Sequence, residues 1–292
     1  MRLVTYLSPS GPRVGVLRPL EAARDEIVDL NRFDPNLPTS LKQLLTMGDA
    51  GLQQAKRAQQ QGEPLTGEPP QLLPPVADPQ KVICVGLNYA DHAAETGAKV
   101  GDEPVIFCKF PTALRGHLQP IELPAVSTKV DYEAELVVVI GRQTRNVSRE
   151  AAWEHVAGYC CGHDVSARDW QIGKPGGQWL LGKSFDSFAP LGPCLVTRDE
   201  ILDPGNLSIE LRLNGRTMQD SNTNQLIFPV DSIVSYLSQV CTLLPGDLIF
   251  TGTPSGVGMG RQPPVFLQPG DTVEVSIEKV GVLRNPVVAE GR

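Results

Sequence analysis

The fold of this chain is most clearly predicted by residues 131–140, Asp131-Tyr132-Glu133-Ala134-Glu135-Leu136-Val137-Val138-Val139-Ile140. The last five residues form an unbroken apolar run of strand length, which is typical of a strand covered on both faces. On a strand, side chains two positions apart point to the same face, so Glu133 and Glu135 share one face. The stretch therefore predicts a buried strand with two carboxylates together at its start.

Two carboxylates at the start of a buried strand need a compensating positive charge. A divalent cation supplies it, because hard cations such as Mg²⁺ prefer carboxylate oxygens; alternatively, this end of the strand lies in water. Asp164 is a candidate third ligand if the fold brings its turn to the strand, and otherwise it caps a local turn. Three carboxylates without a Cys-x-x-Cys pair or paired histidines predict Mg²⁺ or Mn²⁺ better than Zn²⁺.

Short strand-like segments dominate the chain around this stretch. Separated by Gly, Pro, Asn or Asp, they predict strands at residues 82–86, 105–109, 134–140, 207–213, 247–251 and 272–277. Two helices are predicted, one after Ser148 and one from Asp231. Because the strands do not alternate regularly with helices, we expect an α+β fold that is mainly β, and not a doubly wound parallel sheet.

The N-terminal part has a different organisation. Strands are predicted at residues 3–7, 14–17 and 27–30, followed by a helix that Thr39 or Ser40 caps and by a polar helix near residues 51–60. Residues 62–80 contain six prolines and two glycines, which is typical of an extended linker. We therefore predict a small N-terminal α/β domain with its linker at residues 1–75 and a larger domain at residues 76–292.

The composition limits the possible functions. Of the 292 residues, 41% are hydrophobic and 20% charged, as in an ordinary soluble globular protein, and the net charge is −7. The chain has no run of Lys and Arg for nucleic acid and no apolar run of the ~20 residues that span a bilayer. The first residues lack the pattern of a signal or transit peptide, so we expect a cytoplasmic protein, or alternatively a mature mitochondrial one.

Three further segments could contribute chemistry. His92 and Glu95 would be neighbours on one helical turn, where a carboxylate orients an imidazole as a general base requires; exposed pairs of this kind are also common and inert. Lys183 lies between bulky apolar residues, which predicts either a buried lysine with an anionic partner or a surface lysine. Residues 251–258 follow an apolar strand and are rich in glycine, so they form either an anion-binding loop or a plain turn.

Taken together, five motifs resemble the fumarylacetoacetate hydrolase family. They are Asn88-Tyr89-x-x-His92-x-x-Glu95, Tyr132-Glu133-x-Glu135-Leu136, Asp164-Val165-Ser166-Ala167-Arg168-Asp169-x-Gln171, Gly182-Lys183-Ser184-Phe185-Asp186 and Thr251-Gly252-Thr253-Pro254-x-Gly256-Val257-Gly258. The N-terminal Leu30-Asn31-x-Phe33-Asp34-Pro35-x-Leu37-Pro38 further resembles the group called fumarylacetoacetate hydrolase domain-containing protein 2. The resemblance covers nearly the whole chain.

This resemblance implies a mixed β-sandwich roll with a small N-terminal domain, and usually a homodimer. It implies Mg²⁺ or Mn²⁺ as the cofactor and assigns a role to nine residues. The expected metal ligands are Glu133, Glu135 and Asp164, the expected catalytic residues are His92, Glu95 and Lys183, and the expected substrate-binding residues are Arg168, Gln171 and Thr253.

The resemblance also implies a reaction. We expect an enzyme that acts on a small enolisable 2-oxo acid through a metal-bound enolate, most simply keto–enol tautomerisation of oxaloacetate. The same enolate leads to three alternatives: decarboxylation of oxaloacetate, C–C hydrolysis of an acylpyruvate, and isomerisation of 2-hydroxyhepta-2,4-diene-1,7-dioate. A protein that binds a metal and a dicarboxylate without turnover is an alternative of another class. Neither nucleic acid nor membrane is an expected partner.

Overall fold

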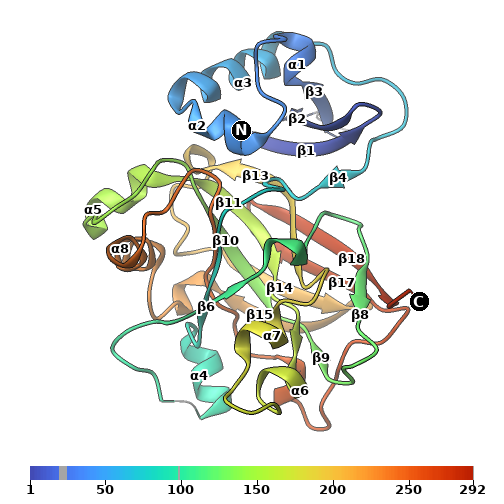
Figure 1. Cartoon of the computed structure of the whole chain (residues 1–292), viewed down its shortest axis with the longest axis vertical. Helices are drawn as coiled ribbons and strands as arrows, with labels where there is room; N and C mark the ends of the chain where they lie inside the picture. Colours follow the sequence, from blue (N-terminus) through green and yellow to red (C-terminus); the bar gives the residue numbers. More distant parts are fainter. Residues whose placement is uncertain (20–24, 98, 292) are drawn as a thin grey trace.

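A computed structural model describes residues 1–19, 25–97 and 99–291 of the chain. A small N-terminal part lies above a larger body built from two sheets (Figure 1). Both parts contain buried apolar side chains that belong to a single hydrophobic core. Within the described residues, no helix is both long and apolar enough to cross a membrane.

The N-terminal part consists of a small antiparallel meander covered by helices. Its elements are β1 (Arg2–Ser8), β2 (Gly11–Arg18), β3 (Glu26–Asp29), α1 (Leu30–Phe33), α2 (Leu41–Thr46), α3 (Asp49–Gln61) and β4 (Leu72–Leu73). The Ser40 hydroxyl caps α2, as predicted. The prediction that a strand continues through Leu30 is wrong, because Asp29 accepts a hydrogen bond from the amide of Arg32 and so starts α1.

One large sheet runs through both parts of the molecule. Its strand order is β3-β2-β1-β13-β11-β10-β16-β5-β6, and β1 pairs antiparallel with β13, so the N-terminal meander extends the main sheet. The division of the chain near residue 75 therefore stays a prediction. The strands not yet introduced are β5 (Val82–Gly86), β6 (Val105–Lys109), β7 (Leu114–Arg115), β10 (Ala134–Ile140), β11 (Val156–His163), β13 (Ala189–Thr197) and β16 (Leu248–Phe250).

A second sheet packs against the centre of the first. Its order is β15-β14-β17-β18-β8, and its strands contact β10, β11 and β13. Buried and partly exposed residues alternate along β17, as expected for a sheet with one face on the core. The strands are β8 (Ile121–Leu123), β14 (Ser208–Leu213), β15 (Arg216–Asn222), β17 (Thr272–Ile277) and β18 (Gly281–Ala289). The predicted α+β, mainly β sandwich is confirmed.

Short elements connect the strands of the two sheets. A two-stranded ladder pairs β9 (Val130–Asp131) with β12 (Ser166–Ala167). The α-helices are α4 (Ala90–Thr96), α5 (Arg149–Ala152), α6 (Arg168–Gln171), α7 (Trp179–Lys183) and α8 (Val230–Val240), and the 3₁₀ helices are η1 (Pro111–Ala113), η2 (Trp153–His155), η3 (Arg198–Glu200), η4 (Thr223–Gln225) and η5 (Gly258–Gly260). Of these elements, α4, α6 and α7 carry the predicted site residues His92, Arg168 and Lys183.

The strand predicted at residues 134–140 is central in the large sheet. Every residue of β10 is buried, and β10 lies between β11 and β16. The predicted bounds of β5, β6, β10 and β17 match those observed. The strands β11 and β13 were not predicted, because glycines and prolines interrupt their apolar pattern.

Candidate active site

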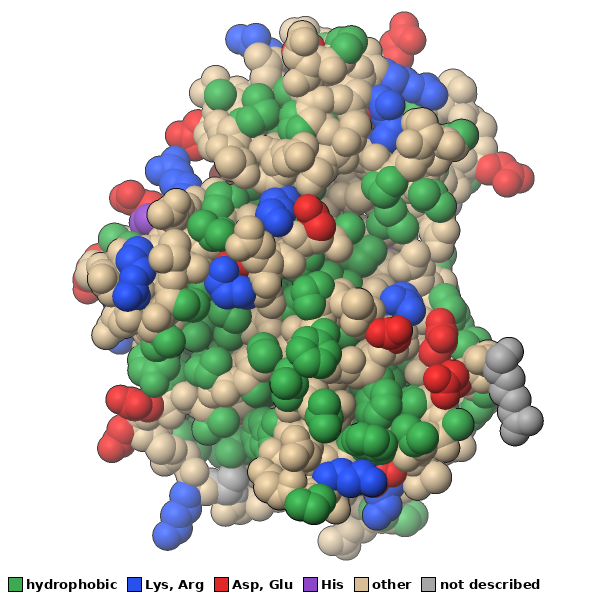
Figure 2. Space-filling view, in the orientation of Figure 1, with side chains coloured by type: hydrophobic (Ala, Val, Ile, Leu, Met, Phe, Trp, Pro, Cys, Tyr) green, Lys and Arg blue, Asp and Glu red, His purple; other side chains and the backbone are tan. Residues whose placement is uncertain are grey.

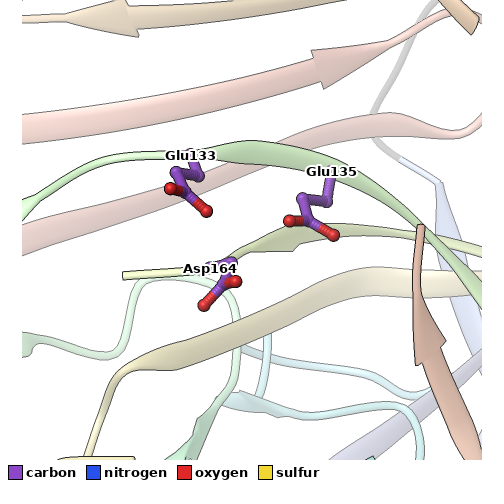
Figure 3. A group of neighbouring side chains, drawn as sticks. All are labelled: Glu133, Glu135 and Asp164. Carbon is purple, nitrogen blue, oxygen red and sulfur yellow. The ribbon is translucent and has the colours of Figure 1, made fainter. Parts of the chain in front are cut away.

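The three predicted metal ligands converge at the start of β10. Glu133 precedes the strand and Glu135 lies within it, opposite Gly162 of β11. Asp164 follows β11, and its amide donates a 2.9 Å hydrogen bond to the carbonyl of Glu133. One carboxylate oxygen from each residue lies within 4.8 Å of the other two, and the three side chains lie side by side (Figure 3). The convergence of Asp164, which spacing could not establish, results from the pairing of β10 with β11.

Buried cations compensate two of these carboxylates. Lys183 Nζ lies 2.7 Å from Glu133 Oε2 and 2.8 Å from Asp164 Oδ2. Arg168 Nη2 lies 2.6 Å from Glu133 Oε1, and Lys109 Nζ lies 2.5 Å from Asp164 Oδ1. Burial opposes the charge on Glu133, but Lys183 and Arg168 together lower the pKa of its carboxyl group. Glu133 is therefore an anion with two cationic partners.

Glu135 has no cation in contact with it among the residues that the structure describes. Its Oε2 accepts a 2.8 Å hydrogen bond from the amide of Gly252. Gly252 has a φ of +105°, and a Cβ there would lie 2.9 Å from Asn88, so only glycine fits at this position without strain. Burial, followed by the charges of Asp164 and Glu133, raises the pKa of Glu135 well above its usual range.

This imbalance fits a divalent cation. Three buried carboxylates offer hard oxygen ligands around one point, and Glu135 lacks the positive charge that its ionised form requires. The nearby imidazole of His163 does not supply it, because burial lowers the pKa of His163 to about 3 and the ring is neutral at pH 7. The donor set matches the ligands that Mg²⁺ and Mn²⁺ prefer.

Arg168 contacts several buried polar side chains of the site. Its Nε lies 2.8 Å from Asp131 Oδ2, and its Nη1 donates a 2.9 Å hydrogen bond to Gln171. Asp131 in turn accepts hydrogen bonds of 2.7 Å and 3.0 Å from the amides of Gly258 and Met259. A single guanidinium therefore joins Glu133 to Asp131, and Asp131 in turn holds η5, which fits a positioning role for Arg168.

The predicted His92–Glu95 pair forms on α4. His92 Nδ1 lies 3.0 Å from Glu95 Oε2, and Glu95 Oε1 accepts a 2.9 Å hydrogen bond from the amide of Gly256. The pair is thereby attached to the glycine-rich loop. Because Glu95 occupies Nδ1, Nε2 is the nitrogen of His92 that stays available to a ligand.

A cavity of about 140 Å³ opens beside the carboxylates. All of the predicted site residues except Glu95 line it, including Thr253, whose hydroxyl accepts a 2.8 Å hydrogen bond from Gln219 Nε2. The full lining is Val85, Gly86, Leu87, His92, Thr96, Phe107, Glu133, Glu135, Asp164, Arg168, Gln171, Ile172, Trp179, Lys183, Thr253, Val257 and Met259.

Sequence reasoning missed Lys109, the other buried lysine of the site. Besides Asp164, its ammonium group contacts the carbonyl oxygens of Val165 and Phe188 at 3.1 and 2.8 Å, and that of Lys183. It lies in Val105-Ile106-Phe107-Cys108-Lys109-Phe110, and a lysine among apolar residues is the same signal that identified Lys183. Applied evenly, that signal would have found both.

The chain resembles proteins of one family along its length. Residues 81–288 match the family model described as fumarylacetoacetate (FAA) hydrolase C-terminal. A Xenopus laevis protein named oxaloacetate tautomerase fahd2, mitochondrial, is 47% identical over 289 residues, which cover 99% of this chain and 90% of that protein. The Homo sapiens oxaloacetate tautomerase FAHD2A, mitochondrial, is also 47% identical, with 99% and 92% of the two chains covered.

Solved structures agree with these matches. A putative HpcE protein from Mycobacterium smegmatis superposes with a TM-score of 0.88 at 40% identity, with both chains covered completely. The maleylpyruvate hydrolase from Sphingobium sp. SYK-6, solved with manganese(II) and pyruvate, has a TM-score of 0.81 at 32% identity, again with complete coverage. On this similarity of sequence and fold, the chain belongs to the fumarylacetoacetate hydrolase family.

Proposed function

We propose that this chain is a divalent-metal-dependent enzyme that interconverts the keto and enol forms of oxaloacetate. The observation that carries the proposal is the cluster of Glu133, Glu135 and Asp164, which faces a small cavity and is one cation short. The relatives named oxaloacetate tautomerase, 47% identical over 99% of the chain, supply the substrate.

Glu133, Glu135 and Asp164 would hold the cation, which we propose to be Mg²⁺ or Mn²⁺. When bound, it supplies Lewis-acid stabilisation of negative charge on the 2-oxo oxygen of the substrate. Manganese(II) in the Sphingobium maleylpyruvate hydrolase supports a metal of this kind. Arg168 keeps Glu133 in place through its 2.6 Å contact, so the ligand geometry is set before the metal arrives.

Two side chains of the cavity can move the proton between C3 and oxygen. His92 presents Nε2 while Glu95 holds its other nitrogen, as a general base requires. Lys183 lies at the edge of the carboxylates and can donate a proton or a hydrogen bond to the oxygen of an enol. Gln171 and Thr253 line the same cavity and would orient the substrate carboxylates.

The proposal is tested by following the ultraviolet absorbance of enol-oxaloacetate as it decays. We expect Mg²⁺-loaded enzyme to accelerate the decay and excess chelator to abolish the acceleration. A decay rate equal to that of buffer, with metal shown to be bound, would contradict the tautomerase proposal.

Hydrolysis of an acylpyruvate is the second candidate. The His92–Glu95 pair suits activation of a water molecule, and the similar Sphingobium structure is named a maleylpyruvate hydrolase. Assays for acetate from acetylpyruvate, and for pyruvate from oxaloacetate, separate hydrolysis and decarboxylation from tautomerisation. If a Glu135→Gln variant loses metal but keeps every cellular role, a non-catalytic binding protein is the better description.

A second copy of the chain is the proposed protein partner. The strand β6 lies at the end of the large sheet, and its Val105 and Ile106 are 45% and 37% exposed. Unpaired apolar edges of this kind favour pairing with another chain. Sedimentation should give the mass of a dimer, and a Val105→Glu, Ile106→Lys double variant should sediment as a monomer.

The cellular location is part of the same proposal. The names of the tautomerase relatives place those proteins in mitochondria, which fits the mitochondrial alternative and not the cytoplasmic expectation. Fractionation of cells that produce the protein would decide between the two compartments.

A further inference from the structure

The residues that line the cavity fall into two chemical groups. The polar group includes the carboxylates, Lys183 and Arg168. The apolar group consists of Val85, Leu87, Phe107, Ile172, Trp179, Val257 and Met259. The proposed function uses the polar group, and the apolar group faces the rest of any ligand that the cavity holds.

Phe107 and Trp179 form an aromatic wall close to the carboxylates. Their ring centroids are 5.4 Å apart at an interplanar angle of 75°, an edge-to-face contact. Lys183 Nζ lies 5.2 Å from the Phe107 centroid and 2.7 Å from Glu133 Oε2. The same ammonium group therefore contacts both a carboxylate of the site and the Phe107 ring of the aromatic wall.

The wall cannot easily move back from the cavity. The indole of Trp179 packs on Gly86, where a Cβ would lie 2.7 Å from Cζ3 of the indole. Gly182 of the same helix packs against Gln171, and a Cβ there would lie 2.6 Å from the backbone nitrogen of Gln171. Because α7 carries both Trp179 and Lys183, any shift of the wall would also move the lysine.

Lys109, the last residue of β6, and Phe110, which follows it, contact the C-terminal end of α7. The Ser184 hydroxyl accepts a 3.1 Å hydrogen bond from the amide of Phe110, and the ammonium of Lys109 holds the Lys183 carbonyl. Trp179 and Lys183 are four residues apart and therefore lie on the same face of the helix. The helix α7 thus sets a fixed spacing between a cation and an aromatic wall.

We infer that Trp179 limits the length of the 2-oxo acids that the site accepts. This inference rests on the proposed function, in that the ligand is a 2-oxo acid whose carboxylate end lies at Glu133, Glu135 and Asp164. Trp179 lines the same cavity of about 140 Å³ as the carboxylates, so an alkyl chain long enough to reach the apolar lining residues meets the indole, and these residues offer no cation for a distant second carboxylate. Arg168 and Lys183 already contact carboxylates. Removal of the indole should therefore admit alkyl tails but not longer dicarboxylates.

The test measures binding to Mn²⁺-loaded enzyme by calorimetry, with pyruvate, 2-oxohexanoate, 2-oxooctanoate and 2-oxoadipate as probes. The readout is the ratio of the affinity for 2-oxooctanoate to that for pyruvate within each variant, because a general loss of structure lowers both affinities and leaves the ratio unchanged. The variants are Trp179→Ala and the milder Trp179→Leu, which guards against a folding defect. Trp153→Ala is the matched control, since Trp153 is partly buried but does not line the cavity.

In the wild type and in Trp153→Ala, 2-oxooctanoate should bind at least about tenfold more weakly than pyruvate. In Trp179→Ala the ratio should rise by about fourfold for each methylene that becomes buried, with a smaller rise in Trp179→Leu, whereas 2-oxoadipate should stay a poor ligand. A ratio in Trp179→Ala within about twofold of the wild-type ratio would overturn the inference.

The outcome is separable from that of the proposed reaction, because binding needs no turnover. If the ratio changes as expected but enol-oxaloacetate decays at the buffer rate, the inference stands and the tautomerase proposal fails. If turnover is confirmed while wild-type enzyme binds pyruvate and 2-oxooctanoate equally, the proposal stands and the inference is overturned.

Discussion

The molecule contains two groups of residues around buried carboxylates, here called clusters, and they differ in how completely the carboxylates are paired. In the N-terminal part, Asp29 is 1% exposed and its oxygens lie 2.6 and 2.8 Å from nitrogens of the Arg13 guanidinium. Asp29 also accepts hydrogen bonds from the hydroxyl of Tyr6 and the amide of Arg32. Every lone pair that burial removes from water has a partner within the chain.

The cluster at β10 is incomplete by comparison. Three carboxylates converge there, and within the described part of the chain the amide of Gly252 is the only hydrogen-bond donor to Glu135. The pKa values follow this difference. Burial opposes ionisation in both clusters, but Arg13 and Tyr6 hold the pKa of Asp29 below its usual range, whereas the pKa of Glu135 is raised. A saturated carboxylate fits a structural role, and an unsaturated one fits a ligand that is yet to bind.

The largest expected effect is the loss of turnover in Glu135→Gln. The variant replaces an anionic metal ligand by a neutral amide, and the accelerated decay of enol-oxaloacetate should fall by at least about 100-fold. The Asp29→Asn variant, assayed well below its unfolding temperature, should keep the wild-type rate. Equal losses of turnover in Glu135→Gln and Asp29→Asn would contradict a metal-binding role for the β10 cluster and a structural role for the Asp29 cluster.

Replacement of Lys109 should give the largest loss of stability. Lys109→Met leaves Asp164 Oδ1 without its 2.5 Å cation, and the free energy of unfolding should fall by about 3–5 kcal/mol. Urea denaturation in chelator measures it. Lys129→Met, at an exposed position, is the control and should change stability by less than about 0.5 kcal/mol. If Lys109→Met changes the free energy of unfolding as little as Lys129→Met does, the contacts of Lys109 do not stabilise the fold.

A smaller loss is expected for Asp29→Asn, about 3 kcal/mol, because Arg13 loses the carboxylate that its partly buried guanidinium contacts. Asp49→Asn provides the matched control. The Asp49 side chain pairs with Arg142 but is 74% exposed, so its removal should be almost neutral. If both variants lose equally little stability, the Asp29 cluster is not a structural unit.

The smallest effect is a dependence on pH. The pKa of Asp29 is lower in the folded state than in the unfolded state. The contribution of Asp29 to the free energy of unfolding is therefore fully present above the unfolded pKa of about 3.9, and it is lost as the pH falls through the folded pKa. The difference in unfolding free energy between wild type and Asp29→Asn should therefore narrow as the pH is lowered from 5 to 3. A difference that stays constant over this range would contradict the lowered pKa.

Local patterns predicted the parts of the fold that depend on local sequence. The apolar run of β10 and the alternation of Glu133 and Glu135 follow from the side-chain period of a strand. The pairing of β1 with β13 joins segments about 190 residues apart, and no local pattern could reveal it. The strand β13 was also hidden, since Pro190, Gly192 and Pro193 read as a loop.

The site was predicted in the same uneven way. Strand period brought two carboxylates together, whereas Asp164 depended on the family resemblance, because its position is set by the register of Glu135 with Gly162. The aromatic wall was missed because Phe107 and Trp179 are far apart in sequence and meet only in the folded chain.

Titration of Mn²⁺ into chelator-treated protein tests the central claim most directly. Calorimetry should show one Mn²⁺ bound per chain in the wild type and in Asp29→Asn, and no binding in Glu135→Gln at the same concentrations. Undiminished binding in Glu135→Gln would contradict the assignment of the metal to Glu133, Glu135 and Asp164.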